Sequence, residues 1–324
     1  MKYLQLRIAF LVGRLFPRRV GYGIARRIAD VFLWVDRQGR ENVIGNLKQV
    51  HQFSGVALSE RALRALAREN FLNFAKYLVD FFHFSRLDAR RINRLVDFAN
   101  SRKVLDAVRE HGHGAIIISA HLGNWELGVA ALAMNGYPIH AVALQHPNQK
   151  VNDLYWSQRA ARGLRAIPMG RAARECIALL RRNELVALVA DRDFTAARDV
   201  VEFFGRAARL PSGPAKLALA TGAPLVPIFM VRRPDDTYTY IVEEPIWADR
   251  GRDTVEDIMR RMAVSLEQVI SRYSEQWFLF HNPWDIERDR ALATAVAFGA
   301  KAPAVFPASR PAEPAIRPGD SRVP

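Results

Sequence analysis

The sequence predicts an α/β fold, in which a single, largely parallel or mixed sheet is flanked by helices and follows a helical, membrane-associating N-terminal part. Short apolar runs such as 115–119 (AIIIS) and 185–190 (LVALVA) alternate with helical segments, as expected of strands buried on both faces. Half of the 324 residues are hydrophobic, so the chain can bury a large core without disulfides. The single cysteine, Cys176, fits a reducing compartment. A disordered chain and a disulfide scaffold are therefore excluded.

The first 50 residues predict two basic amphipathic helices on either side of Pro17. They carry ten basic and three acidic side chains, so about half of the chain's net charge of +14 lies there. Their apolar runs are far shorter than the ~20 residues that span a bilayer. Arg7 and Arg14 also interrupt the apolar region that a signal peptide would need. Such helices either lie in an anionic membrane surface or pack on the protein with their arginines in water.

The later elements follow from apolar periodicity and turn signals. Leu63, Phe71 and Phe82 recur at helical spacing behind Ser59, a suitable N-cap, which predicts a long helix from 59 to about 84. The other predicted helices are 102–110, 125–134, 171–182, 214–220 and 255–272. The other predicted strands are 139–144, 225–231, 238–242 and 277–280.

Composition divides the chain into three predicted parts. Residues 1–100 are helical and basic, and 101–288 form the α/β domain. Residues 289–324 hold six of the 17 prolines and show no apolar period, which is typical of a disordered tail.

The segment 111–149 carries one charged residue, Glu126, where the chain's average of 25% would place about ten. His121 directly follows the strand 115–119, at the edge of the sheet where ligands bind in open α/β folds. Gly123 and Asn124 suit a turn and an N-cap, so Glu126 falls in the first helical turn and can approach His121. A carboxylate beside an imidazole favours a general base that takes a proton from a hydroxyl. Alternatively, Glu126 only complements the helix dipole and His121 is a buried core residue.

Asp191, Arg192 and Asp193 directly follow the strand 185–190, so they lie at the same predicted edge and close to His121. Two carboxylates separated by one residue can hold a divalent metal, as in metal-dependent glycosyltransferases. The alternative is an Asp pair at a strand end that forms ion pairs with arginine.

The run 203–216 (FFGRAARLPSGPAK) is a Gly- and Pro-rich loop that leads into a helix and carries Arg206 and Arg209. A helix N-terminus with arginines nearby binds phosphate, although an ordinary surface turn has the same composition. The chain contains no G-x-S-x-G elbow and no H-E-x-x-H motif. These features favour base-assisted transfer to a hydroxyl without a covalent enzyme intermediate, and we expect no metal and no cofactor.

The segment IIISAHLGNWELG resembles the H-x-x-x-x-[DE] motif of the lysophospholipid acyltransferase superfamily. More closely, the chain resembles the lipid A biosynthesis acyltransferases, the lauroyl and myristoyl transferases, and their phosphatidylinositol-mannoside relatives. The similarity covers about residues 5–285 in order. Besides this motif, it rests on RENVIGNL at 40–47, the Asn/Arg/Gly segment from 152 to 163, ADRDF at 190–194, the block at 203–229 and EQWFLFHNPW at 275–284.

The resemblance implies that His121 deprotonates an acceptor hydroxyl, which attacks the thioester of an acyl-carrier protein or acyl-CoA. Glu126 would orient His121, and Asp191 and Asp193 would organise the site. It also implies a lipid acceptor and a peripheral or monotopic place on the cytoplasmic face of the inner membrane. The residues that we expect to bind substrate are Asn124, Arg159, Arg162, Asp191, Arg192, Asp193, Arg206 and Arg209.

Two other classes of function remain open at this point. A metal-dependent glycosyltransferase would use Asp191 and Asp193. A non-catalytic basic module would bind anionic membrane or nucleic acid with a steep salt dependence. Because the charge concentrates on amphipathic helices, we expect an anionic membrane surface and no nucleic-acid partner.

Overall fold

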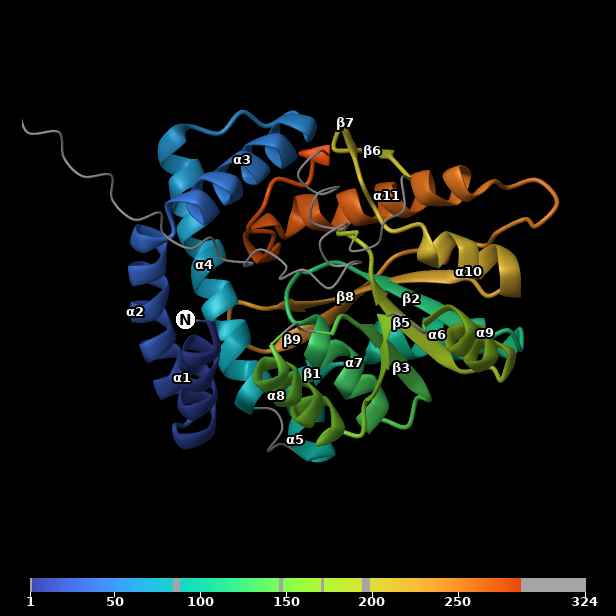
Figure 1. The fold of residues 1–324 in the computed structure, drawn as a ribbon, viewed down its shortest axis with the longest axis horizontal. Coiled ribbons are helices and arrows are strands. Elements are labelled where there is room, and N and C mark those ends of the chain that lie inside the picture. Colours follow the sequence, from blue (N-terminus) through green and yellow to red (C-terminus); the bar gives the residue numbers. More distant parts are fainter. Residues whose placement is uncertain (1, 84–87, 146–147, 170–171, 194–198, 287–324) are drawn as a thin grey trace, which may run out of the picture.

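The computed structural model describes residues 2–83, 88–145, 148–169, 172–193 and 199–286. Its centre is a seven-stranded sheet with the strand order β1-β9-β8-β2-β5-β3-β4. Neighbouring strands run parallel except β8 and β9, which are antiparallel (Figure 1). The predicted α/β class with a mostly parallel, mixed sheet is therefore confirmed.

The element bounds follow the chain in order. The strands are β1 (Val96–Asp97), β2 (Ala115–Ser119), β3 (Ile139–Ala143), β4 (Arg165–Pro168), β5 (Leu185–Val189), β6 (Val201–Phe203), β7 (Arg206–Ala208), β8 (Leu225–Arg232) and β9 (Tyr238–Val242). The helices are α1 (Lys2–Leu15), α2 (Arg18–Val35), α3 (Arg37–Phe53), α4 (Glu60–His83), α5 (Ala89–Leu95), α6 (Ala99–Glu110), α7 (Trp125–Met134), α8 (Gln149–Ala160), α9 (Ala172–Arg181), α10 (Gly213–Thr221), α11 (Val255–Arg272) and the 3₁₀ helix η3 (Ser274–Gln276).

The apolar strands and helices lie where their periodicity predicts them, and four of them, β2, α7, β9 and α11, have exactly the expected bounds. The structure also contains elements that we do not predict individually. The segment 89–97 forms α5 and β1, the segment 149–168 forms α8 and β4, and the β6–β7 hairpin spans 201–208, where we predict a loop from 203 onward. These strands are short, and none of them carries a long apolar run. The predicted tail, 289–324, lies outside the described residues.

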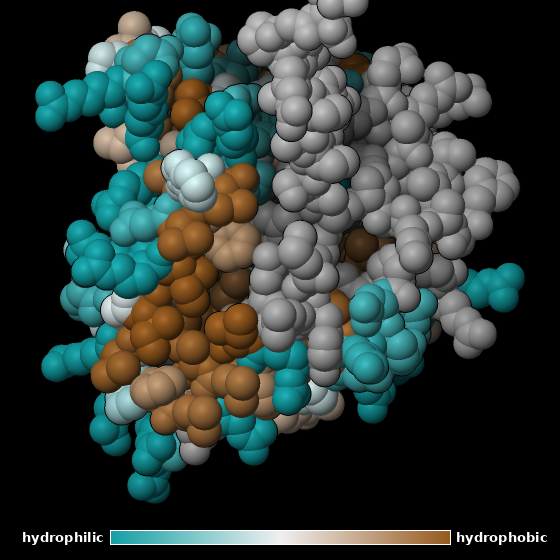
Figure 2. Space-filling view, turned by 60° about the vertical axis from the view of Figure 1, so that its left-hand side comes forward, coloured by the Kyte–Doolittle hydropathy of each residue, from teal (hydrophilic) through white to brown (hydrophobic). Residues whose placement is uncertain are grey.

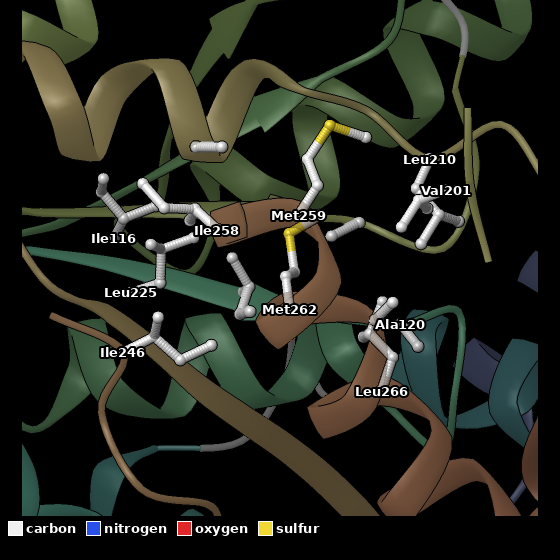
Figure 3. Close-up of a cluster of buried hydrophobic side chains, with 14 of the residues drawn as sticks. Ile116, Ala120, Val201, Leu210, Leu225, Ile246, Ile258, Met259, Met262 and Leu266 are labelled. Atoms are coloured by element: carbon white, nitrogen blue, oxygen red, sulfur yellow. The ribbon is translucent and has the colours of Figure 1, made fainter. Parts of the chain in front are cut away.

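The larger core lies between one face of the sheet and the helices α9, α10 and α11. Figure 3 shows α11 presenting Ile258, Met259 and Leu266 to this layer, with Ile116 of β2 and Leu225 of β8 among their neighbours. These side chains recur at helical spacing on α11, and Thr254 begins the helix with a capping box. A second core, which includes side chains of α6 and α7, covers the opposite face. The sheet is thus buried on both sides, as its apolar strands predict.

The helices α1, α2 and α4 stand together at one side of the sheet (Figure 1). A shared apolar core joins this helical layer to the C-terminal segment, because Phe71 of α4 packs edge-to-face on Phe280 with 5.1 Å between ring centroids. A buried polar cluster forms a second connection, in which Asp80 of α4 accepts hydrogen bonds from Tyr22 of α2 and from Arg232 of β8. The helical layer is therefore fixed to the C-terminal segment through apolar contacts and to the sheet through charged contacts.

The strand predicted at 277–280 is wrong. After η3 this segment forms a single bridge, between Trp277 and Leu122, outside the named strands. Side-chain amides satisfy its backbone instead of a neighbouring strand, because Asn70 donates to the carbonyl of Trp277 at 2.7 Å and Asn46 donates to that of Leu279 at 2.8 Å. Asn42 and Asn46, which lie in the RENVIGNL segment, thus help to hold the chain beside the H-x-x-x-x-E motif.

The outer side of α1 and α2 combines exposed apolar and basic side chains. Figure 2 shows an apolar patch bordered by hydrophilic residues on the face that carries these helices. The inner side packs through Tyr22, Ala25 and Ala29. Among the described residues, no helix is both long and apolar enough to cross a bilayer. The exposed apolar residues, which we call the N-terminal patch, are Ile8, Leu11, Leu15, Phe16, Val20, Val31, Trp34 and Val35.

Candidate active site

The turn between β2 and α7 presents His121 at the carboxyl edge of the sheet. Gly123 has φ +62°, and a side chain there would clash with the carbonyl oxygen of Met230, so the turn requires glycine. Asn124 caps α7, as predicted, by accepting a hydrogen bond from the backbone of Leu127 at 3.0 Å. The carbonyl of His121 accepts a hydrogen bond from the amide of Phe278 at 2.7 Å. The backbone on both sides of His121 is thus fixed.

Asp191, at the end of β5, is the carboxylate that contacts His121. Nδ1 of His121 lies 2.7 Å from Oδ1 of Asp191, and the backbone amide of His121 donates to Oδ2 at 3.0 Å. The indole of Trp277 donates to the same Oδ2 at 2.9 Å. This corrects the expected partner, which was Glu126. Because β2 and β5 are parallel neighbours, their ends bring residues 70 positions apart into contact.

The protonation of this pair follows from its surroundings. Burial of Asp191 would raise the pKa of its carboxyl, but the charge and hydrogen bonds of His121, together with the hydrogen bond from Trp277, lower it overall. An ionised carboxylate only accepts hydrogen bonds, so Nδ1 of His121 carries a proton, and in the neutral form of the ring Nε2 then holds the lone pair. Since 25% of the His121 side chain is exposed, the ring is accessible to a substrate. This is the arrangement of a general base that a carboxylate orients.

Glu126, in the first turn of α7, forms a bidentate ion pair with Arg159 of α8. Its two oxygens accept from Arg159 at 2.5 and 3.1 Å, and both side chains are buried. Burial alone would raise the pKa of Glu126, but Arg159, Arg162 and His121 lower it. Glu126 is therefore anionic and close enough to His121 to stabilise an imidazolium. Arg159 keeps a further donor, because its Nη1 is buried and has no hydrogen-bond partner among the described residues.

The remaining predicted site residues lie at different depths. Arg162 is buried, donates to the carbonyl of Phe81 and has its pKa lowered to about 10 by burial. Asp193 pairs with Arg209 at 3.5 Å, and both are buried. Arg206 lies on the exposed hairpin with its guanidinium 5.3 Å from the ring of Trp284. Among the described residues, no three His, Cys, Asp or Glu side chains gather as metal ligands.

A cavity of about 1580 Å³, which we call the central cavity, opens beside His121. Most of its lining side chains are apolar. Of the predicted site residues it reaches five, whereas Asn124, Arg162, Asp191, Arg206 and Arg209 do not line it. The five that do are His121, Glu126, Arg159, Arg192 and Asp193.

Comparison with known proteins identifies the family. The model of the bacterial lipid A biosynthesis acyltransferase family matches residues 2–285. The chain belongs to this family. As a member it is an acyltransferase, which decides against the glycosyltransferase and the non-catalytic alternatives.

Two relatives share part of the sequence of this family member. It is 27% identical over 223 residues to a phosphatidylinositol mannoside acyltransferase of Mycolicibacterium smegmatis, which covers 68% of this chain and 72% of the relative. It is 30% identical over 160 residues to a phosphatidylinositol mannoside acyltransferase of Mycobacterium tuberculosis, which covers 48% of this chain and 51% of the relative. Against that second relative, the match therefore spans about half of either protein.

Sequence reasoning missed the contribution of Trp277 to the site. The residue lies in EQWFLFHNPW, which supports the resemblance, but nothing in its spacing indicates that its indole reaches Asp191. The same holds for Tyr77 of α4, which stacks on Trp125 at 4.4 Å between ring centroids beside His121. Both contacts join elements that are far apart in the sequence, so only the fold reveals them.

Proposed function

We propose that this acyltransferase moves a fatty acyl group from a thioester donor to a hydroxyl of a membrane glycolipid, with His121 as the general base. One observation carries the proposal: His121 borders a large, mostly apolar cavity while its Nδ1 bonds an ionised Asp191. The base and a space for an acyl chain therefore meet at one point. The phosphatidylinositol mannoside relatives support a glycolipid acceptor.

The reaction follows from the hydrogen bonds of His121. Its Nε2 takes the proton of the acceptor hydroxyl, and the oxygen attacks the thioester carbonyl carbon. The tetrahedral intermediate collapses as the C–S bond breaks, and the imidazolium returns the proton to the leaving thiolate. Asp191 holds the ring and stabilises its charge, while the nearby negative charge of Glu126 adds to this stabilisation.

Arg159 is the group that we assign to a substrate oxygen. Its bidentate pair with Glu126 fixes the guanidinium in the wall of the central cavity, and its Nη1 remains as a donor. A fixed guanidinium suits a phosphate oxygen or the thioester carbonyl. Glu126 then acts on the substrate through Arg159 as well as on His121 through its charge.

The substitution His121→Ala tests the assignment directly. We expect it to lower kcat by about 10²- to 10⁴-fold, because that is the usual contribution of a general base, and to leave the fold intact, because Asp191 keeps its hydrogen bonds from the backbone amide of residue 121 and from Trp277. The assay follows transfer of a labelled palmitoyl group from palmitoyl-CoA, and separately from the acyl-carrier protein, to a phosphatidylinositol mannoside and to a lipid A precursor. The exposed His113 provides the matched control, His113→Ala. Full transfer by the His121→Ala enzyme would refute the mechanism, and lipid analysis of a deletion strain would name the acceptor.

We further propose that the N-terminal patch places the enzyme on an anionic membrane surface. The apolar side chains of the patch stand beside exposed arginines such as Arg19 and Arg26, the composition of an interfacial helix. Ile8 and Val31 belong both to the patch and to the wall of the central cavity. A lipid can therefore pass from the membrane surface into the cavity without crossing water.

Point substitutions test the patch better than truncation. Deleting residues 1–35 would also remove Tyr22, which bonds the buried Asp80, and so would damage the fold. We expect Trp34→Ser with Leu15→Ser to weaken binding to vesicles that contain anionic lipid by tenfold or more, because 79% and 68% of these residues are exposed. Val264→Ser on the exposed face of α11 is the matched control. Equal vesicle binding by all three proteins would contradict the proposed orientation.

A further inference from the structure

The central cavity reaches both faces of the sheet. Adjacent residues of a strand point to opposite faces, yet Ala141 and Val142 of β3 both line the cavity. The same is true of Ala187 and Leu188 of β5. A cavity beside only one face would meet alternate residues. This one therefore passes around the carboxyl ends of the strands, next to His121.

The two parts of the cavity have different walls. The part on one face, which we call the α7 arm, is lined by Ile117 of β2 and by Val129 and Leu132 of α7. On the other face, Cys176 of α9 and Leu217 of α10 line the part that we call the α9–α10 arm. Ile117, Leu132, Cys176 and Leu217 are all buried. Both arms thus enter the apolar interior, and His121 stands where they meet.

The size of the cavity indicates more than one ligand group. Sites for one small molecule usually measure about 300–1000 Å³, whereas this cavity measures about 1580 Å³. The polar phosphopantetheine part of a donor gains little from two apolar arms, because its amides would lose hydrogen bonds to water. Acyl chains, in contrast, are stabilised by burial in either apolar arm. The lining also includes Arg192 and Asp193, and Asp193 pairs with Arg209, which lies shortly before α10. These charged side chains suit a molecule with a polar headgroup beside its chain.

We propose that the enzyme holds two acyl chains at once, with the donor's chain in the α7 arm and a chain of the lipid acceptor in the α9–α10 arm. The inference rests on the proposed function for the identity of the two chains, but the existence of two chain sites does not depend on turnover. The sheet separates the chains, and their polar ends converge on His121.

Chain binding can be counted without catalysis. Native mass spectrometry with palmitate as the probe should show two bound chains on the wild-type protein. Val129→Phe fills the α7 arm and Ala172→Phe fills the α9–α10 arm, both at half-buried positions that line the cavity. Each variant should bind one palmitate. Ala178→Phe, on the exposed side of α9 and away from the cavity, should still bind two. A single palmitate on the wild type, or two on Ala172→Phe, would overturn the proposal.

Kinetics assign each arm to its substrate. Ala172→Phe should raise the KM for a diacylated phosphatidylinositol mannoside tenfold or more relative to the KM for the deacylated headgroup, while the preferred donor chain length stays that of the wild type. Val129→Phe should shift the preferred donor to shorter chains. If Ala172→Phe instead alters donor length preference, the α9–α10 arm belongs to the donor and the proposal fails. If two palmitate molecules bind but His121→Ala retains activity, the inference of two chain sites is supported and the proposed mechanism is refuted.

The chain's single cysteine provides a readout that needs no arm-filling variant. Cys176 lines the α9–α10 arm and is itself buried, so its modification by methyl methanethiosulfonate should be slow in the free protein and at least fivefold slower with palmitate bound there. Cys176→Ser, which lacks the thiol, should show no modification and serves as the blank. If saturating palmitate leaves the rate of modification unchanged, no chain occupies this arm.

Discussion

The buried carboxylates Asp80 and Asp191 differ in whether the groups around them line the central cavity. Asp80 accepts from Arg18 and Tyr22 on α2 and from Arg232 and Tyr238 on the sheet. Burial would raise the pKa of Asp80, but Arg232 and Arg18 lower it, as His121 lowers that of Asp191. Both carboxylates are ionised in the interior. None of the residues of the Asp80 cluster lines the central cavity, whereas His121 beside Asp191 does.

This difference distinguishes a cluster that stabilises the fold from a candidate functional site. A buried, charged group with a shifted pKa is a candidate functional residue, yet ion pairs that stabilise a fold shift pKa values in the same way. The Asp80 cluster joins the helical layer to β8 and β9 and turns its donors toward its own carboxylate. Around the proposed site, by contrast, His121 and Arg159 both line the cavity, and Nη1 of Arg159 has no hydrogen-bond partner among the described residues. We therefore distinguish the two clusters by whether their polar residues line the cavity.

Among these tests of the two clusters, we expect the largest effect from the substitution Asp191→Asn. An amide in that place can turn its NH₂ toward Nδ1, which favours the wrong tautomer of His121. We expect kcat to fall by about 10⁴-fold, as in related triads, with little change in melting temperature. Adding His121→Ala should cost almost nothing further, because the two residues act together. Additive losses in the double variant would contradict a common role.

The opposite outcome is expected for Asp80→Ala. Removing the close carboxylate partner of the buried Arg232 leaves it only the longer contact to Asp236 at 3.5 Å, and breaking a buried pair typically costs about 3–5 kcal/mol in the free energy of unfolding. Because Asp80 lies outside the cavity, kcat per folded molecule should stay within about twofold of the wild type. Urea unfolding and assays below the transition measure the two effects. A large loss of kcat with unchanged stability would break the distinction between the clusters.

Acid titration follows the same cluster. The folded-state pKa of Asp80 lies below its unfolded value of about 3.9, so its stabilisation is complete above that pH and is lost as the pH falls toward the folded value. The difference in free energy of unfolding between wild type and Asp80→Asn should be constant from about pH 5 to 7 and shrink on further acidification. Chemical denaturation at each pH measures this difference. A gap that widens in acid would show that Asp80 is protonated in the fold.

The smallest effect is expected for Arg206→Ala. We predict this residue as a substrate group from its place in FFGRAAR, but its guanidinium lies over Trp284 on the exposed hairpin and away from the cavity. Surface substitutions of this kind change stability by about 0.5 kcal/mol or less. KM for the donor and the acceptor should stay within about twofold. A tenfold rise in either value would return Arg206 to the site.

Local patterns predict the layers of the fold, and their limits explain what is missed. An apolar run such as AIIIS fixes β2 because only a strand buried on both faces suits it. The amphipathic pattern of α11 fixes that helix equally well. The segment 277–280 looks like a strand, yet amides from α3 and α4 bind its backbone, and no local pattern reports such a long-range partner.

The candidate site shows the same limit. The position of His121 follows from a strand, a turn glycine and a capped helix within ten residues, so the sequence predicts it. Its partner does not follow, because two carboxylates, Glu126 and Asp191, stand near the same edge. Asp191 becomes the partner because β2 and β5 are neighbours in the sheet, whereas Glu126 pairs with Arg159 of α8. That order is a property of the sheet, and α8 itself is not predicted.

The asparagine contacts to the C-terminal segment have a consequence for the candidate site. Asn70 and Asn46 belong to the helices α4 and α3, and the segment that they bind supplies the amide of Phe278 to His121 and the indole of Trp277 to Asp191. The order of the sheet edge beside His121 therefore depends on contacts that begin on the N-terminal helices. The helical layer is thus part of the framework of the candidate site as well as the carrier of the N-terminal patch.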